Sequence, residues 1–138
     1  RVLPDMGGGV LDQPHAGGHV RVATLERTLV DVLDAPQHGG GWEEVWRSLE
    51  SVEFFDLDAV VEHALKLDSS LTVARVGFFL DQHRETLMAE ERHLAALRER
   101  APVQPLYLDR KREPGKLVRA WNLVVPERVL SRSWAAVA

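Results

Sequence analysis

Basic side chains gather near the C-terminal end of the chain, where they could bind phosphate groups. Between residues 109 and 119 five cations and two carboxylates leave a net charge of +3. A basic hairpin can lie along a phosphate backbone or enter a minor groove, although a charged turn in an ordinary protein is often only solvated. Both interpretations stay open. The candidate nucleic-acid-binding residues are Arg110, Lys111, Arg112, Lys116 and Arg119.

Two aromatic residues accompany this basic segment, which we define as residues 109–119. Tyr107 precedes the segment and Trp121 follows it. A surface that stacks on bases needs two or three exposed aromatic side chains on one face. We therefore expect Trp121 to pack on helices, as is usual for a tryptophan in a strand. Trp42 and Trp46 are spaced as core residues of one helix.

The sequence gives little support for catalysis or for metal binding. The chain has no cysteine, and neither GxSxG, HExxH nor a phosphate-binding glycine motif is present. His63, His83 and His93 fall on predicted helices beside charged residues, so we expect them to be solvated or at helix ends. No carboxylate is placed beside them by local spacing. We expect a protein that is not an enzyme and that has no cofactor and no metal.

Two arginines lie close to apolar stripes of predicted helices, where an unpaired charge is costly. They are Arg27 and Arg75, and we expect each to pair with a carboxylate. The candidate partners are Glu26, Asp31 and Asp81. Gly77 lies beside Arg75 on the same predicted helix, where it would let another element approach closely.

The elements that must position these residues follow from periodicity and turn signals. Apolar stripes predict helices over residues 24–35, 41–52, 57–67, 71–83 and 86–100, with Thr24 and Asp56 as N-caps. Alternation predicts strands over 104–108 and 117–125, which Pro114-Gly115 would join as an antiparallel hairpin. A last helical turn is expected within 127–134. Before the helices, residues 1–19 are predicted to be irregular, with short strands possible at 1–4 and 19–22.

These elements predict an α+β fold: about five packed helices followed by an antiparallel β-hairpin. We expect residues 1–22 to be an irregular N-terminal segment and residues 23–134 to be one helical domain, with the hairpin at 104–125. The length of 138 residues and the 45% hydrophobic content suit one globular domain. No apolar run is long enough to span a bilayer, so we expect a cytoplasmic protein without membrane contact.

The net charge of −4 is unevenly distributed. Residues 1–70 hold 5 basic and 13 acidic side chains, whereas residues 71–138 hold 12 basic and 8 acidic ones. The second half could therefore present a basic face to nucleic acid despite the negative total. The chain begins with Arg1, so we expect it to be part of a longer protein.

Several short motifs, in this order, resemble the C-terminal domain of the AbiEi antitoxin family. The segments are VATLERTLVDVLDAP, GGWEEVWRSLES, DLDAVVEHALKL, ARVGFFLDQH and PLYLD with WNLVVP, within residues 20–126. The residues that carry the resemblance, expected to be structural, are Glu26, Arg27, Thr28, Asp31, Ala74, Arg75, Gly77, Trp121 and Leu123.

The resemblance implies a non-enzymatic antitoxin and transcriptional autorepressor of a bacterial type IV toxin–antitoxin system, which acts in abortive infection. Such a regulator opposes a nucleotidyltransferase-like toxin, largely without a stable complex, and binds operator DNA through an N-terminal winged helix. No helix-turn-helix pattern precedes residue 20, and residues 1–22 would be the remnant of a linker to that domain. The alternative is a protein-interaction or dimerisation module that makes no contact with DNA.

Overall fold

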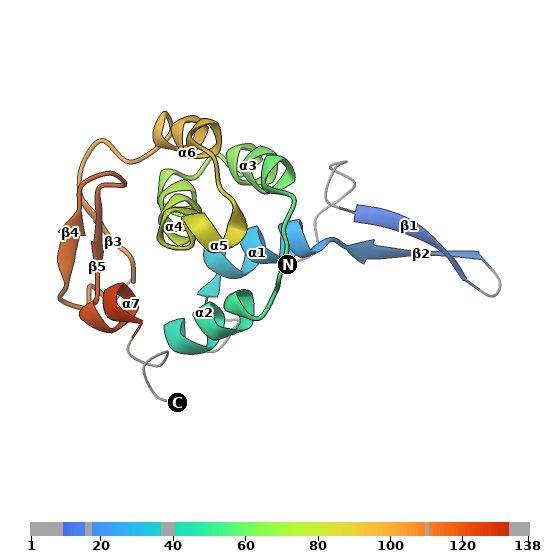
Figure 1. Ribbon diagram of the computed structural model, residues 1–138, viewed down its shortest axis with the longest axis horizontal. Helices are drawn as coiled ribbons and strands as arrows, with labels where there is room; N and C mark the ends of the chain where they lie inside the picture. The colour runs from blue at the N-terminus through green and yellow to red at the C-terminus, as the bar shows by residue number, and fades with distance from the viewer. Residues whose placement is uncertain (1–9, 16–17, 37–40, 110, 133–138) are drawn as a thin grey trace.

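The computed structural model describes residues 10–15, 18–36, 41–109 and 111–132, with backbone only before residue 24. The described residues form an α+β fold, as predicted (Figure 1). The helices are α1 (Leu25–Asp34), α2 (Trp42–Glu50), α3 (Leu57–Lys66), α4 (Ser70–Gln82), α5 (Arg84–Leu87), α6 (Glu91–Arg98) and α7 (Glu127–Ser131). The strands are β1 (Val10–His15), β2 (Gly18–Ala23), β3 (Leu106–Tyr107), β4 (Lys116–Val118) and β5 (Leu123–Val125).

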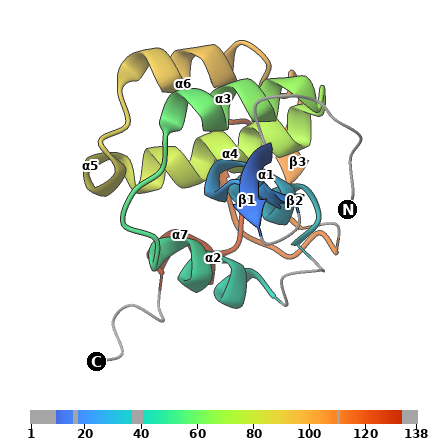
Figure 2. The ribbon, with the colours of Figure 1, turned by 90° about the vertical axis from the view of Figure 1, so that its right-hand side faces the viewer.

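Helix α4 is the centre of the helical body. Its side chains from Thr72 to Leu80 are all buried, which is typical of a helix covered on every side. Helices α1, α3 and α6 pack on it, α1 also packs against α3, and α2 lies on the side away from α6 (Figure 2). The three-stranded sheet stands at one end of this body, and the β1–β2 hairpin extends from the other (Figure 1).

Helices α1 and α3 begin where the sequence predicts because their first turns are capped by side chains. The Thr24 hydroxyl accepts a hydrogen bond from the Arg27 amide at 3.2 Å, and the Asp56 carboxylate accepts one from the Ala59 amide at 3.3 Å. Each bond satisfies an amide that has no partner inside the helix. Both predicted caps are confirmed.

The predicted fifth helix, over residues 86–100, is in fact two helices. Met88 adopts a left-handed conformation with φ of 57°, which ends α5 after Leu87. Helix α6 then starts after Glu90, whose amide donates to the Nδ1 atom of His93 at 3.0 Å. The buried side chains of Leu87 and Ala89 hold both sides of the break in the core. Helical spacing alone does not reveal such a break.

The predicted hairpin is wrong in its pairing. Strand β3 pairs with β5 in parallel, β4 pairs with β5 antiparallel, and the order is β3-β5-β4. The tight turn lies at residues 119–122, inside the segment predicted as one strand. The strand is interrupted there because the Trp121 side chain enters the core and Asn122 adopts a left-handed conformation with φ of 53°. Gly115 fits directly against the carbonyl of Val125, where any Cβ would overlap the main chain.

The N-terminal hairpin differs in part from the expectation. Strand β1 forms within the segment predicted as irregular, and it pairs antiparallel with β2 from Val10 opposite Ala23 to His15 opposite Gly18. Strand β2 agrees with the strand predicted over residues 19–22. The expected strand at residues 1–4 lies outside the described residues. Near the C-terminus, α7 supplies the expected last helical turn.

The close approach expected at Gly77 is confirmed, and the element that approaches is the turn between β4 and β5. The Trp121 ring is fully buried and lies directly on Gly77, so that a Cβ at residue 77 would overlap it. The indole N–H donates to the Asp81 carboxylate at 3.1 Å. This contact attaches the sheet to α4.

We predict that Gly77→Ala destabilises the protein. Alanine favours a helix by about 1 kcal/mol over glycine. Displacing a large buried ring nevertheless outweighs this gain, and we expect a net loss of about 1–3 kcal/mol in the free energy of unfolding. Urea denaturation measures the effect. Gly41→Ser is the control, because nothing lies within 4 Å of a Cβ there and serine caps the helix better. Wild-type stability of Gly77→Ala would contradict the prediction.

Candidate nucleic-acid interface

The basic segment lies at the sheet end of the molecule. It begins just after β3, runs through the connection to β4 and ends in the turn before β5. The side chains of Lys111, Arg112, Lys116 and Arg119 are exposed, and Arg110 lies outside the described residues. Strand β4 is an edge strand. The structure therefore brings the predicted cations to one end of the fold.

These four exposed cations differ from the other positive side chains in their surroundings. Within the described part of the chain, none of their charged side-chain nitrogens has a carboxylate oxygen within 4.0 Å. Nine other described cations have one. They are Arg27, Arg47, Lys66, Arg84, Arg92, Arg98, Arg100, Arg128 and Arg132. The positive potential of the described surface is therefore concentrated on the basic segment.

The carboxylate of Glu113 lies inside the basic segment but is bound by another arginine. Arg128 of α7 donates two hydrogen bonds to it, at 2.7 and 3.0 Å. This bidentate contact lowers the pKa of Glu113. It also fixes the connection between β3 and β4 on α7. Arg128, which lies outside the basic segment, thus balances the negative charge of Glu113, and Glu113 does not neutralise the four exposed cations.

Arg75 positions the start of the basic segment from inside the core. Its side chain is 2% exposed. The guanidinium donates to the carbonyl of Leu108 at 2.7 and 3.0 Å, and to the carbonyl of Leu33 at 3.0 Å. It also lies 5.2 Å from the centre of the Trp42 ring. Arg75 therefore joins α4 to the end of α1 and to the residue that follows β3.

The aromatic residues near the segment have different exposures. Trp121 is fully buried and packs on α4, as predicted, so it is not a surface for stacking on bases. Trp42 and Trp46 are buried in the core, also as predicted. Tyr107, in contrast, is 40% exposed on β3.

Four of the residues that carry the resemblance lie on α1: Glu26, Arg27, Thr28 and Asp31. Arg27 pairs with Asp31 at 3.5 Å, which was one of the expected pairings. The Glu26 carboxylate accepts a hydrogen bond from the Asp56 amide at 2.8 Å, which ties α1 to the start of α3. Thr28 donates to the carbonyl of Thr24 at 3.0 Å. In this structure all four motif side chains make contacts within the fold.

The three helical histidines are buried rather than solvated, but all three lie at helix ends, which was the other expected position: His63 in the last turn of α3, His83 at the end of α4 and His93 in the first turn of α6. Two of them have carboxylates nearby. His83 lies 2.6 Å from Glu50, and His93 lies 3.2 Å from Asp58. These partners are more than 30 positions apart and meet only because α2 packs near α4 and α3 near α6. No spacing rule finds such pairs. In the parts of the chain described here, no three His, Asp or Glu side chains are grouped to hold a metal ion.

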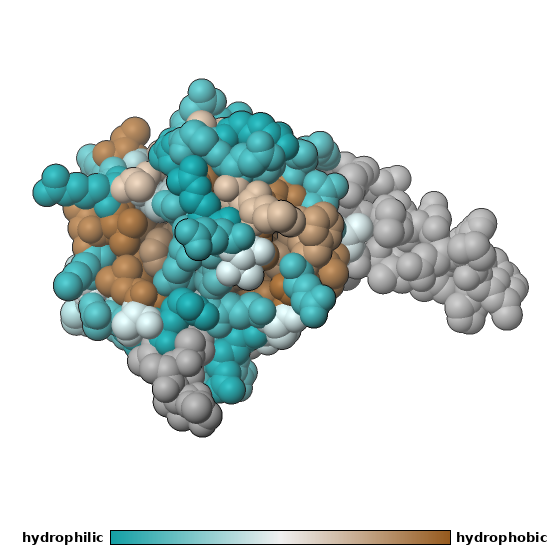
Figure 3. Space-filling view, in the orientation of Figure 1, coloured by the Kyte–Doolittle hydropathy of each residue, from teal (hydrophilic) through white to brown (hydrophobic). Residues whose placement is uncertain are grey.

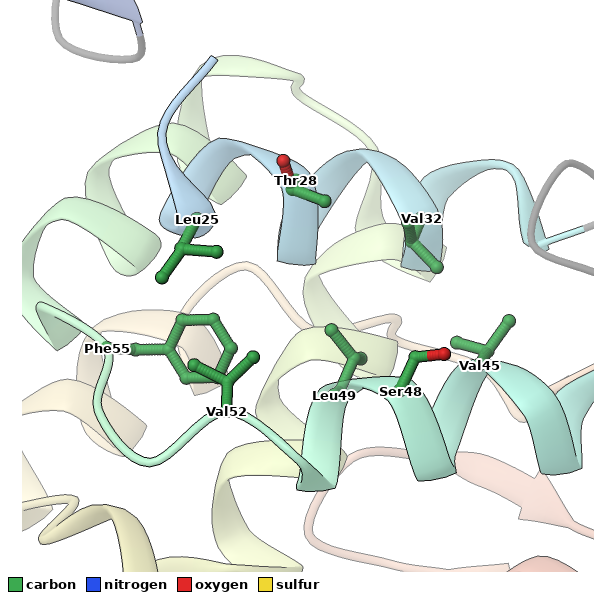
Figure 4. Close-up of a pocket in the computed structure, with 8 residues that line it drawn as sticks. All are labelled: Leu25, Thr28, Val32, Val45, Ser48, Leu49, Val52 and Phe55. Atoms are coloured by element: carbon green, nitrogen blue, oxygen red, sulfur yellow. The ribbon is translucent and has the colours of Figure 1, made fainter. Parts of the chain in front are cut away.

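The structure also has an apolar groove between α1, α2 and the connection to α3 (Figure 4). Its volume is about 150 Å³. The exposed side chains of Leu25 and Phe54 lie on the same elements. The sequence does not reveal this groove, since several lining residues, such as Val45, Leu49 and Phe55, are also buried core positions. The lining residues are Leu25, Thr28, Val32, Val45, Ser48, Leu49, Val52 and Phe55.

No protein-family model, curated protein or solved structure matches this chain. The family is therefore not shown by any comparison. Among the helices of the described residues, none is both long enough and apolar enough to cross a membrane.

We predict that the pKa of His63 lies below its ordinary value of 6.5. Burial disfavours the charged imidazolium, and the Nε2 atom has no hydrogen-bond partner among the described residues. Proton NMR of the imidazole signals against pH measures the midpoint, and His63→Gln assigns the resonance. A midpoint at 6.5 or above would show that the ring is hydrated or paired in solution.

Proposed function

We propose that this chain is a non-enzymatic antitoxin and autorepressor domain of a type IV toxin–antitoxin system, and that its basic segment assists binding to operator DNA. The observation that carries the DNA contact is the position of the exposed cations. Lys111, Arg112, Lys116 and Arg119 are the described cations that face solvent without a carboxylate nearby. Cations in this state release counterions from a polyanion when they bind it.

The total charge of −4 is compatible with this proposal, since binding depends on the local potential. Asp109 is the one other carboxylate in the segment besides Glu113, and it accepts a hydrogen bond from the Lys111 amide at 3.0 Å. Arg128 balances Glu113. A phosphate backbone that reaches the sheet end therefore meets mainly positive side chains.

The antitoxin role rests on the resemblance to the AbiEi family, and the contacts of the motif residues support its structural part. Arg75, Gly77 and Trp121 together hold the sheet on the helical body. Such contacts are what we expect of motif residues whose role in a family is structural. In this proposal the domain opposes a nucleotidyltransferase-like toxin without forming a stable complex, and a winged helix elsewhere in the full-length protein supplies most of the operator binding.

The second candidate is a protein-interaction or dimerisation module. The apolar groove of α1 and α2 favours it, together with the exposed side chain of Phe54, which is 63% accessible. Exposed apolar side chains beside a groove are typical of protein interfaces. This module would associate in a concentration-dependent way and would not bind DNA.

We predict that the chain binds duplex DNA in a salt-dependent way through the basic segment. Lys111→Ala with Arg112→Ala should weaken binding at low salt. It should also reduce the slope of log K against log salt by about 0.9 for each phosphate contact that is lost. Fluorescence anisotropy with a labelled duplex measures both quantities.

The matched control removes two cations elsewhere, through Arg47→Ala with Lys66→Ala. Both cations already pair with carboxylates, on α2 and α3 respectively. An equal loss in the control would mean that net charge alone causes binding, which contradicts an interface at the basic segment. A concentration-dependent mass in sedimentation, without duplex binding, would favour the interaction module.

We predict that the full-length protein relieves the toxicity of a nucleotidyltransferase-like toxin whose gene lies beside its own. Growth of cells that express the toxin should recover when the two proteins are co-expressed. Gly77→Ala should reduce this recovery, because it loosens the sheet from α4, whereas Gly41→Ser should not. The absence of such a neighbouring gene, with no recovery of growth, would overturn the antitoxin role and would leave the DNA contact to stand by itself.

A further inference from the structure

The open face of the sheet carries a row of apolar side chains. Tyr107 of β3 and Leu117 of β4 both lie directly opposite Val124 of the central strand β5. Residues opposite each other in a sheet project from the same face. Leu123 and Val125 are fully buried and so face the helices. The row of Tyr107, Val124 and Leu117 therefore lies on the outer face.

This outer row is exposed although it is apolar. Tyr107 is 40% and Leu117 is 44% accessible, while Val124 between them is partly buried. The open face of a sheet packed on one side is ordinarily polar. Figure 3 shows apolar side chains among hydrophilic ones at the sheet end. An exposed row of this kind indicates a surface that meets a partner.

Exposed cations border the row on the same elements. Arg119 lies two residues after Leu117, at the start of the turn, whereas Lys116 alternates with Leu117 and so projects from the other face of the edge strand. Lys111 and Arg112 lie on the connection that follows β3. Because these cations lie on the segments directly after Tyr107 and Leu117, a partner that fits here must offer apolar or aromatic surface together with negative charge.

An unpaired nucleic-acid strand has this combination of properties. In a duplex the bases are stacked inside, and a flat sheet face reaches only sugars and phosphates. In a single strand the bases can turn outward and stack on an aromatic side chain while phosphates lie beside cations. The row is too small for a stable protein interface, which buries about 800 Å² on each partner. One ring, in contrast, suffices for a base.

We propose that the outer face of the β3-β5-β4 sheet binds unpaired nucleotides, with Tyr107 stacking on a base and Lys111, Arg112 and Arg119 holding the adjacent phosphates. This inference rests on the proposed function for its cations but adds a distinct ligand, the exposed base. Leu117 and Val124 extend the apolar floor beside Tyr107. The surface then distinguishes single-stranded from double-stranded nucleic acid through one side chain.

The experiment compares two labelled probes, an oligothymidylate of about 12 nucleotides and a mixed-sequence duplex of the same length. Tyr107→Ala should weaken binding of the single strand by roughly 10-fold and leave duplex binding unchanged. Tyr107→Phe keeps the ring and should retain single-strand binding. Phe54→Ala removes an exposed aromatic side chain from the α2–α3 connection and should change neither affinity.

The outcomes separate this inference from the proposed function. If Tyr107→Ala leaves single-strand affinity unchanged, or if Phe54→Ala reduces it equally, base stacking is overturned. Duplex binding that still depends on Lys111 and Arg112 would then leave the DNA contact standing. If the wild-type chain binds neither probe, both are overturned. Thermal denaturation of each variant shows whether Tyr107→Ala remains folded. If Tyr107→Ala is unfolded, Tyr107→Leu replaces it in the test, because leucine keeps an apolar side chain without a ring. Loss of single-strand binding by Tyr107→Leu supports stacking, and full binding by that variant overturns stacking.

Discussion

The buried guanidinium of Arg75 is the interaction on which the arrangement of this fold depends. A charge taken out of water is tolerated only when its donors are satisfied, and here main-chain carbonyls of Leu33 and Leu108 accept them. These carbonyls belong to the end of α1 and to the residue after β3. If the guanidinium were lost, each buried carbonyl would lose this charged donor, and a buried carbonyl left without a partner costs about 1–3 kcal/mol. One side chain of α4 thus sets where the sheet, and with it the basic segment, meets the helices.

The helices were largely predictable from sequence because their signals are local. Thr24 and Asp56 cap their own first turns, and apolar spacing marks the buried stripes of α1 to α4. The strand pairing was not predictable in the same way. Strand β3 joins β5 in parallel, and the turn at Trp121 exists because its ring fits against Gly77, which is distant in the sequence. A proline-glycine turn signal cannot report a contact over that distance.

The candidate site was predictable in its residues but not in its electrostatics. The run of cations is visible in the sequence, and so is Glu113 among them. Arg128 binds Glu113, whereas the ammonium groups of Lys111 and Lys116 have no carboxylate oxygen within 4.0 Å among the described residues. This difference follows only from the packing of α7. The apolar row of the outer face depends on register. It forms because Tyr107 and Leu117 both lie opposite Val124, which the predicted hairpin did not allow.

Folding changes the meaning of the charge distribution along the chain. Carboxylates of the acidic first half bind arginines of the second half, as in Arg92 with Asp58, Arg100 with Asp68, and Arg132 with Glu50. The pairs of Arg92 and Arg100 are exposed, and exposed ion pairs contribute little to stability, typically less than about 1 kcal/mol. Their larger effect is on the surface potential, because they neutralise the helical body and leave positive charge on the basic segment. Stability therefore resides in the core and Arg75, whereas the binding that we propose for a polyanion would depend on exposed side chains that make no ion pair within the described fold.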